Sequence, residues 1–185
     1  MGVSEPPHTT ILIQADAIAA RVMALAAEIA QDYAGRELHL VGVMRGALYF
    51  LADLSRALQA EDAGALTFDW IELSSYRGGT ESTGNVEVTR DLIDPVDGRH
   101  VLVIEDIVDS GHTMTFLVAL LQARGAATVE VCALLDKPAR RRAPNLQVRY
   151  IGFRIEDQFV LGYGMDLDER HRALPYIAVV AAKPE

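Results

Sequence analysis

Three carboxylates stand close together after an apolar run in the middle of the chain. The segment VLVIEDIVDSGHTM, residues 101–114, carries Glu105, Asp106 and Asp109 and continues with Ser110-Gly111-His112-Thr113. Adjacent acids can bind the hydroxyls of a sugar, hold a metal ion or transfer a proton. The residues after Asp109 are typical of a helix N-terminus, where free backbone N–H groups favour a bound anion. The segment therefore indicates a phosphate cradle with acids beside it for one of those three tasks.

Ordinary helix capping is the alternative interpretation of the same segment. An acid or a serine before a helix often caps its free amides, and capping would account for Asp109 or Ser110 alone. It does not readily account for the consecutive acids Glu105 and Asp106. The sequence contains no Walker loop, and no G-x-G-x-x-G follows a predicted strand. We therefore favour a ligand site of a different kind.

The elements that must position these residues alternate between strand and helix. Apolar runs predict strands at 37–44, 66–76, 86–91, 101–105 and 128–136, with shorter ones within 146–153, 159–164 and 175–181. Apolar residues at helical spacing predict helices at 15–35, 46–59 and 111–124. This alternation predicts an α/β fold, with a central, mainly parallel twisted sheet and helices on both faces.

The acidic segment lies where such a sheet binds ligands. Ligands of open parallel sheets bind beyond the carboxyl ends of the strands, and residues 105–113 follow such an end. A length of 185 residues suits one domain, 1–185. The Pro- and Arg-rich segment 137–144 indicates a boundary between an α/β core at about 15–136 and a smaller C-terminal hood that lies largely within 137–185. The adjacent arginines 140–142 suit a solvated or subunit-contacting face and are assigned no site.

Charge and composition exclude several kinds of partner. The net charge of -9 argues against nucleic acid and against an anionic membrane surface. The first residues lack the pattern of a secretory signal, and no apolar run has the length of a membrane span. Cys132 is the one cysteine and lies in an apolar run, which indicates a packed thiol and not a nucleophile. We expect a cytoplasmic protein.

Residues 101–114 resemble the phosphoribosyl-pyrophosphate (PRPP) binding motif of the type I phosphoribosyltransferases. That motif is an apolar strand, two acids, two apolar residues and then D-[ST]-G-x-T. Four further segments resemble the hypoxanthine/guanine branch, in the same order along the chain. Residues 41–54 resemble its first loop and the following helix, and residues 74–88 resemble its mobile flap. Residues 134–142 resemble its purine-contacting lysine segment, and residues 159–177 resemble its hood. The resemblance covers roughly residues 37–180 and implies the type I fold with a small C-terminal hood.

This resemblance implies an enzyme of purine salvage. Members of the branch transfer ribose 5-phosphate from PRPP to N9 of hypoxanthine or guanine, giving IMP or GMP and diphosphate, and require Mg²⁺. They are dimers or tetramers, so a homodimer or homotetramer is expected. Two alternatives stay open: a regulatory protein of the same fold that senses PRPP or nucleotides, and a phosphoribosyltransferase that prefers xanthine.

The resemblance also assigns roles within the motif at 101–114. Ser110, Gly111, His112 and Thr113 would hold the 5-phosphate, largely through backbone amides. Glu105 and Asp106 would take the ribose hydroxyls, directly or through Mg²⁺. Asp109 would lie near N7 of the purine and act as the general acid/base.

Residues outside that motif receive their roles in the same way. The purine would be bound by Lys137 at O6, by the Phe159 ring and by the Val160 backbone. The diphosphate would be bound by Arg45, Gly46 and Arg172, and Mg²⁺ by Asp166 as well. The flap would begin at Ser75 and Tyr76. Arg45 stands where many relatives have lysine, which keeps the positive charge and changes its geometry.

Overall fold

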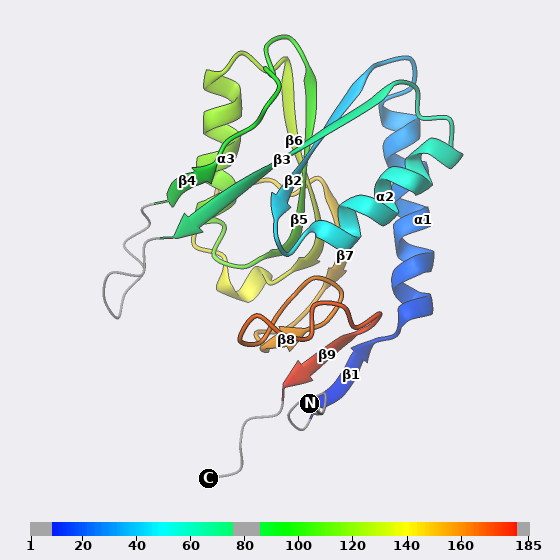
Figure 1. The fold of residues 1–185 in the computed structure, drawn as a ribbon, viewed down its shortest axis with the longest axis vertical. Coiled ribbons are helices and arrows are strands. Elements are labelled where there is room, and N and C mark those ends of the chain that lie inside the picture. The colour runs from blue at the N-terminus through cyan, green and yellow to red at the C-terminus, as the bar shows by residue number, and fades with distance from the viewer. Residues whose placement is uncertain (1–8, 76–85, 181–185) are drawn as a thin grey trace.

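The main sheet accounts for the alternation of strand and helix along the chain. The computed structural model describes residues 9–75 and 86–180, in which six strands pair in the order β4-β3-β2-β5-β6-β7 (Figure 1). Their bounds are β2 Leu38–Met44, β3 Leu66–Ser75, β4 Val86–Arg90, β5 His100–Val108, β6 Thr128–Asp136 and β7 Tyr150–Arg154. Of these neighbouring pairs, only β3 with β4 is antiparallel. The predicted α/β fold with a mainly parallel sheet is confirmed.

Helices cover both faces of this sheet (Figure 1). They are α1 Ala15–Asp32 and α2 Leu48–Ala60 on one face, and α3 His112–Ala123 on the other. One hydrophobic cluster packs Phe50 of α2 with Leu40 of β2, and a second cluster packs Leu117 of α3 with Val41. Consecutive residues of β2 thus contact opposite layers, as the two-residue period of a strand requires.

A smaller sheet forms the hood. It contains β1 Thr9–Ile13, β9 Ile177–Val180 and β8 Val160–Leu161, in the order β1-β9-β8 (Figure 1). The expected division at residue 137 therefore does not follow the strand pairing. β7 lies C-terminal to that point and yet pairs in parallel with β6, while β1 comes from the other end of the chain. A short segment read alone does not show which sheet will accept its hydrogen bonds.

The strand that carries the acids is longer than expected. We predicted its end at residue 105, but β5 continues to Val108, and Ile107 pairs with Leu135 of β6. Glu105 and Asp106 therefore belong to the strand and not to the turn after it. The prediction was wrong because acids are poor strand formers, whereas here the pairing with β6 overrides that preference.

Two further expectations concern burial. Cys132 is completely buried in β6, and burial raises the pKa of its thiol, which leaves the thiol protonated and unreactive. Within residues 9–75 and 86–180, no helix combines the length and the apolar character needed to cross a bilayer.

Candidate active site

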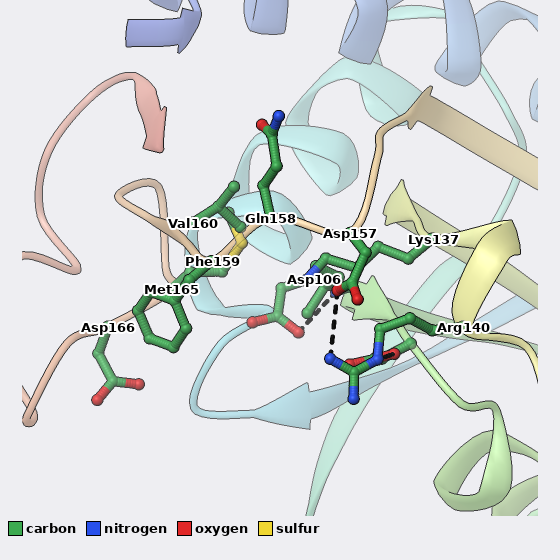
Figure 2. A pocket seen from close by; sticks show the side chains of 11 residues that line it. Asp106, Lys137, Arg140, Asp157, Gln158, Phe159, Val160, Met165 and Asp166 are labelled. Carbon is green, nitrogen blue, oxygen red and sulfur yellow. Dashed lines mark hydrogen bonds and ion pairs between the residues drawn. The ribbon is translucent and has the colours of Figure 1, made fainter. Parts of the chain in front are cut away.

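A cavity opens where β5 and β6 end beneath the hood. Its volume is about 420 Å³. It is lined by Asp106, Ile107, Asp109, Lys137, Arg140, Asp157, Gln158, Phe159, Val160, Met165 and Asp166 (Figure 2). Six of the residues singled out from the sequence, from three separate segments, thus meet at one place. Of the others, Gly46 lies against Asp106, and Arg172 contacts Asp166.

Glu105 and Asp106 form a pair of acids at the floor of this region. Glu105 is only 7% exposed. Burial raises the pKa of its carboxyl, and the adjacent Asp106 carboxylate raises it further. Burial also raises the pKa of Asp106. Two neighbouring acids that resist ionisation in this way favour a cation or a hydrogen-bond donor as a partner.

A second loop approaches these acids closely. It follows β2 and contains a cis peptide between Met44 and Arg45. A Cβ atom at Gly46 would collide with the Asp106 carboxylate, so any other residue here would force the Asp106 side chain out of its position. The Arg45 guanidinium itself points to the hood, where it forms an exposed ion pair of 3.0 Å with Glu169.

The expected phosphate cradle lies at the start of α3. The helix begins at His112, and its N-cap residue is Gly111, with a φ of 87° that suits glycine. Among the described residues, no side-chain hydrogen bond caps the first amides of this helix. The capping interpretation of Asp109 and Ser110 is therefore wrong for this structure. The first amides of α3 have no acceptor within the helix and remain suited to an anion.

The groups suited to binding a base line the opposite wall. Lys137 is only 7% exposed and follows the last residue of β6, so its amine lies at the carboxyl edge of the sheet. Phe159 is 55% exposed, which is unusual for a large aromatic ring and leaves a face available to a flat ligand. Val160 is buried next to it at the start of β8.

Two residues of this wall were not assigned from the sequence. The Arg140 Nε atom lies 2.9 Å from Asp109 Oδ1, and its Nη1 atom donates to Asp157 Oδ1 over 3.2 Å (Figure 2). Asp109 Oδ1 itself is shielded from solvent and has no hydrogen bond within the described residues. Arg140 stands in a run of three arginines three residues after Lys137, which is the signal that could have identified it.

Asp166 and Arg172 contact each other at the far side of the cavity. Arg172 Nη2 lies 2.7 Å from Asp166 Oδ1, and Arg172 Nη1 donates to the Gly164 carbonyl over 2.8 Å. The second oxygen of Asp166 accepts the Glu169 amide over 2.9 Å. Arg172 thus fixes Asp166, and any metal ion at Asp166 would have to replace that ion pair.

Arg45 and Arg172 also line a second, more apolar groove of about 590 Å³. The exposed side chains of Leu48 and Phe68 lie along it. The flap expectation is only partly covered by the structure: Ser75 is the last residue of β3, and Tyr76 lies outside the described residues.

The donors present are compatible with Mg²⁺. Within the described residues, no cluster of three or more His, Cys, Asp or Glu could hold a metal ion. Mg²⁺ is commonly bound through one or two carboxylates, with water and substrate phosphates completing its shell. The adjacent carboxylates of Glu105 and Asp106, both with raised pKa, match that requirement.

Comparisons with known proteins cover the same segments. Residues 8–168 match the phosphoribosyl transferase domain family. A hypoxanthine-guanine phosphoribosyltransferase from Staphylococcus aureus is 42% identical over 87% of this chain and 86% of that protein. A crystal structure of a hypoxanthine phosphoribosyltransferase from S. aureus matches with a TM-score of 0.87 and 38% identity, over 93% of this chain and 91% of that one.

A longer relative contains a region similar to the whole chain. The bifunctional protein TilS/HprT from Listeria monocytogenes is 42% identical over 100% of this chain. The chain spans only 28% of the length of that protein.

Proposed function

Because the chain belongs to the phosphoribosyltransferase family, we propose that it transfers the 5-phosphoribosyl group of PRPP to N9 of hypoxanthine or guanine. The products are IMP or GMP and diphosphate, and the activity serves purine salvage. The observation that carries this proposal is the cavity in which Asp109, Lys137 and Phe159 meet beside the start of α3.

Phosphate and ribose are placed by the first two parts of the site. The amides from Ser110 to Thr113 bind the 5-phosphate at the positive end of α3. Glu105 and Asp106 accept hydrogen bonds from the ribose hydroxyls or hold a cation beside them. These contacts leave C1′ of the ribose directed towards the cavity that takes the base.

The base is placed by the hood wall. Phe159 stacks on the purine, and the Val160 backbone reads the edge of the ring. The Lys137 amine donates to O6, the acceptor that hypoxanthine and guanine have and adenine lacks. Such a polar contact in a buried site discriminates strongly, because an analogue without the acceptor leaves the buried amine unpaired.

Asp109 is the general acid/base. As the bond between C1′ and the diphosphate oxygen breaks and the bond from N9 to C1′ forms, the N7 proton of hypoxanthine passes to Asp109. Proton transfer to a positioned carboxylate contributes about 10²–10⁴-fold in rate. The transition state resembles an oxocarbenium ion, so the acids around the ribose also stabilise its positive charge.

Mg²⁺ would be held by Glu105 and Asp106, with Asp166 as a further ligand on the diphosphate side. When bound, the ion offsets the negative charge that develops on the departing diphosphate. Gly46 and the arginines Arg45 and Arg172 bind the diphosphate from the loop after β2 and from the hood.

We also propose that the active protein is a homodimer or homotetramer. The second groove, with its exposed Leu48 and Phe68, presents an apolar surface of the kind that a subunit contact covers. Size-exclusion chromatography with light scattering measures the mass directly. A monomer at the working concentration of the enzyme would contradict this part of the proposal.

A panel of bases tests the proposed reaction. Purified protein is mixed with PRPP, Mg²⁺ and one base, and turnover is followed by ultraviolet absorbance for hypoxanthine, guanine, xanthine, adenine and uracil. We expect turnover with hypoxanthine and guanine, and kcat/KM at least about 100-fold lower for adenine, which lacks the O6 acceptor. Absence of turnover with every 6-oxopurine would reject the proposal, and a clear preference for xanthine would change the substrate.

A further inference from the structure

We infer that Arg140 is a positioning residue for Asp109, which it holds over the base cavity and releases towards Asp157 when the base binds. This inference rests on the proposed function and extends it to a residue that the sequence left without a role. The reasons are a fixed backbone, a guanidinium shared between two carboxylates, and an ion pair at Asp109 that includes no hydrogen bond.

The backbone holds Arg140 beside the loop that carries Asp109. The Lys137 amide donates to the Val108 carbonyl over 3.0 Å. The amides of Arg142 and Ala143 donate to the Ser110 carbonyl over 2.9 and 3.2 Å. The segment around Arg140 is thus attached to the residues on both sides of Asp109, and the two side chains meet for a structural reason.

The guanidinium uses different nitrogens for its two partners. Nε faces Asp109 and Nη1 donates to Asp157, so Arg140 can keep one carboxylate when it loses the other (Figure 2). The planar arginine head allows this division, whereas a lysine has a single nitrogen for both partners. Asp157 lies two residues before Phe159, so Arg140 also connects the general base with the wall that stacks on the purine.

The contact orients Asp109 through charge and not through a hydrogen bond. Asp109 Oδ1 is shielded from solvent and makes no hydrogen bond within the described residues, although the Arg140 Nε atom lies 2.9 Å away. The purine N–H must therefore displace Arg140 to reach this oxygen. About half of the Arg140 side chain is exposed, and exposed ion pairs contribute little to stability. Exchange of Arg140 from Asp109 to Asp157 is consequently easy when the base arrives.

Kinetics of Arg140→Gln test the inference. We expect kcat to fall about 10-fold, because a misplaced catalytic group loses rate steeply with distance. The KM for PRPP should stay within about 2-fold, since PRPP contacts are unchanged. Arg140→Lys should recover part of kcat. Arg142→Gln is the matched control, because the Arg142 side chain is exposed and makes no ion pair within residues 9–75 and 86–180.

Two double-mutant cycles separate this role from a merely structural one. In the Asp109→Asn background, Arg140→Gln should lower kcat by less than about 2-fold, because Arg140 acts through the carboxylate that has already been removed. Asp157→Asn removes the second carboxylate partner of Arg140. Arg140 then stays at Asp109, and the base must compete with Arg140 for the Asp109 carboxylate. The KM for hypoxanthine should then rise about 5-fold, and adding Arg140→Gln should cancel that rise.

The outcomes are distinct. An unchanged kcat in Arg140→Gln would overturn the inference. An equal loss of kcat from Arg140→Gln in the wild type and in the Asp109→Asn protein would also overturn it. In both cases wild-type turnover would still support the proposed function. If the KM for hypoxanthine stays raised in the Asp157→Asn, Arg140→Gln double variant, the proposed movement of Arg140 from Asp109 to Asp157 is wrong. An inactive wild type would instead reject the proposed function itself, and the inference with it.

Discussion

Asp69 and Glu105 are two carboxylates of one sheet that are buried to a similar degree and bonded very differently. Asp69 of β3 is 2% exposed and accepts three backbone amides, from Trp70, Ile93 and Asp94, over 2.7, 2.5 and 3.1 Å. Within the described residues Glu105 of β5 accepts one backbone amide, that of Asp106, over 3.2 Å. Burial by itself therefore does not identify a functional acid, and the number of donors does.

The shortage of donors at Glu105 has an energetic consequence. A buried carboxylate without enough donors favours its neutral form, and burial together with the Asp106 charge raises the pKa of Glu105 accordingly. Asp69 instead fastens the loop at 93–94 to the middle of β3 through its amide contacts. We interpret Asp69 as a structural acid and Glu105 as an acid that is kept for a ligand.

The largest expected effect concerns Asp109, the third acid of the site. Asp109→Asn should lower kcat about 10²–10⁴-fold, because the amide cannot take the purine proton. The melting temperature should change little, since the ion pair of Asp109 with Arg140 is about half exposed and such pairs contribute little to stability. Steady-state kinetics and thermal unfolding measure the two quantities. Near-normal turnover would remove Asp109 from its proposed role.

Asp69→Ala should show the opposite profile. Three partly buried amides lose their acceptor. A fully buried unpaired donor costs about 1–3 kcal/mol, so for these three together we expect a loss of about 1–3 kcal/mol in the free energy of unfolding. Urea denaturation measures this loss. The kcat of the protein that remains folded should be close to that of the wild type. A stable variant with reduced kcat would place Asp69 with the acids of the site.

Glu105→Gln should stabilise the free protein at neutral pH. The raised pKa means that wild type loses stability as pH rises from the unfolded value towards the folded pKa, whereas glutamine does not titrate. At pH 8 the melting temperature of the variant should exceed that of wild type by about 2–4 °C, the shift expected for ~1 kcal/mol. The difference should vanish below the unfolded pKa. If Glu105→Gln were less stable than wild type at pH 8, the proposed difference between Glu105 and Asp69 would be wrong.

The smallest effect is expected at Asp91, an exposed acid. The Arg124 guanidinium donates to both of its oxygens over 2.6 and 2.7 Å and lowers its pKa. A lowered pKa gives stability that is present above the unfolded value and lost as pH falls through the folded pKa. Asp91→Asn should therefore lower the free energy of unfolding at pH 7 by about 0.2–1 kcal/mol, and by less in strong acid. If Asp91→Asn lowered the free energy of unfolding as much as Asp69→Ala, the exposure of an acid would not predict its contribution to stability.

Much of the architecture could be predicted from local pattern. Hydrophobic runs and helical spacing indicated the strands and helices that form the main sheet and its two layers, because these periods arise from short-range geometry. The motif at 101–114 indicated the phosphate cradle, because acids, glycine and hydroxyls in that order suit a helix N-terminus. The exact end of β5 was missed, since pairing with β6 decides it.

Other features depend on partners that are distant in the chain. Arg140 and Asp157 are separated by 17 residues, and the contact of Arg140 with both Asp157 and Asp109 requires the hood to lie over the sheet edge. The entry of β1 into the hood joins the two ends of the chain. No local period or motif encodes such meetings, because each needs both segments to be placed by the whole core.

By itself the sequence determined the order of strands and helices, the position of the acidic motif and the family to which they belong. Only the tertiary structure decided what surrounds each charged group. Asp69 receives two amides from a loop that folds back over β3 and one from the adjacent Trp70. Glu105 receives one amide, and Arg140 contacts two carboxylates from separate segments. The physical reason is that the state of a buried charge depends on the donors and charges within a few ångströms, and folding brings these together from distant parts of the chain.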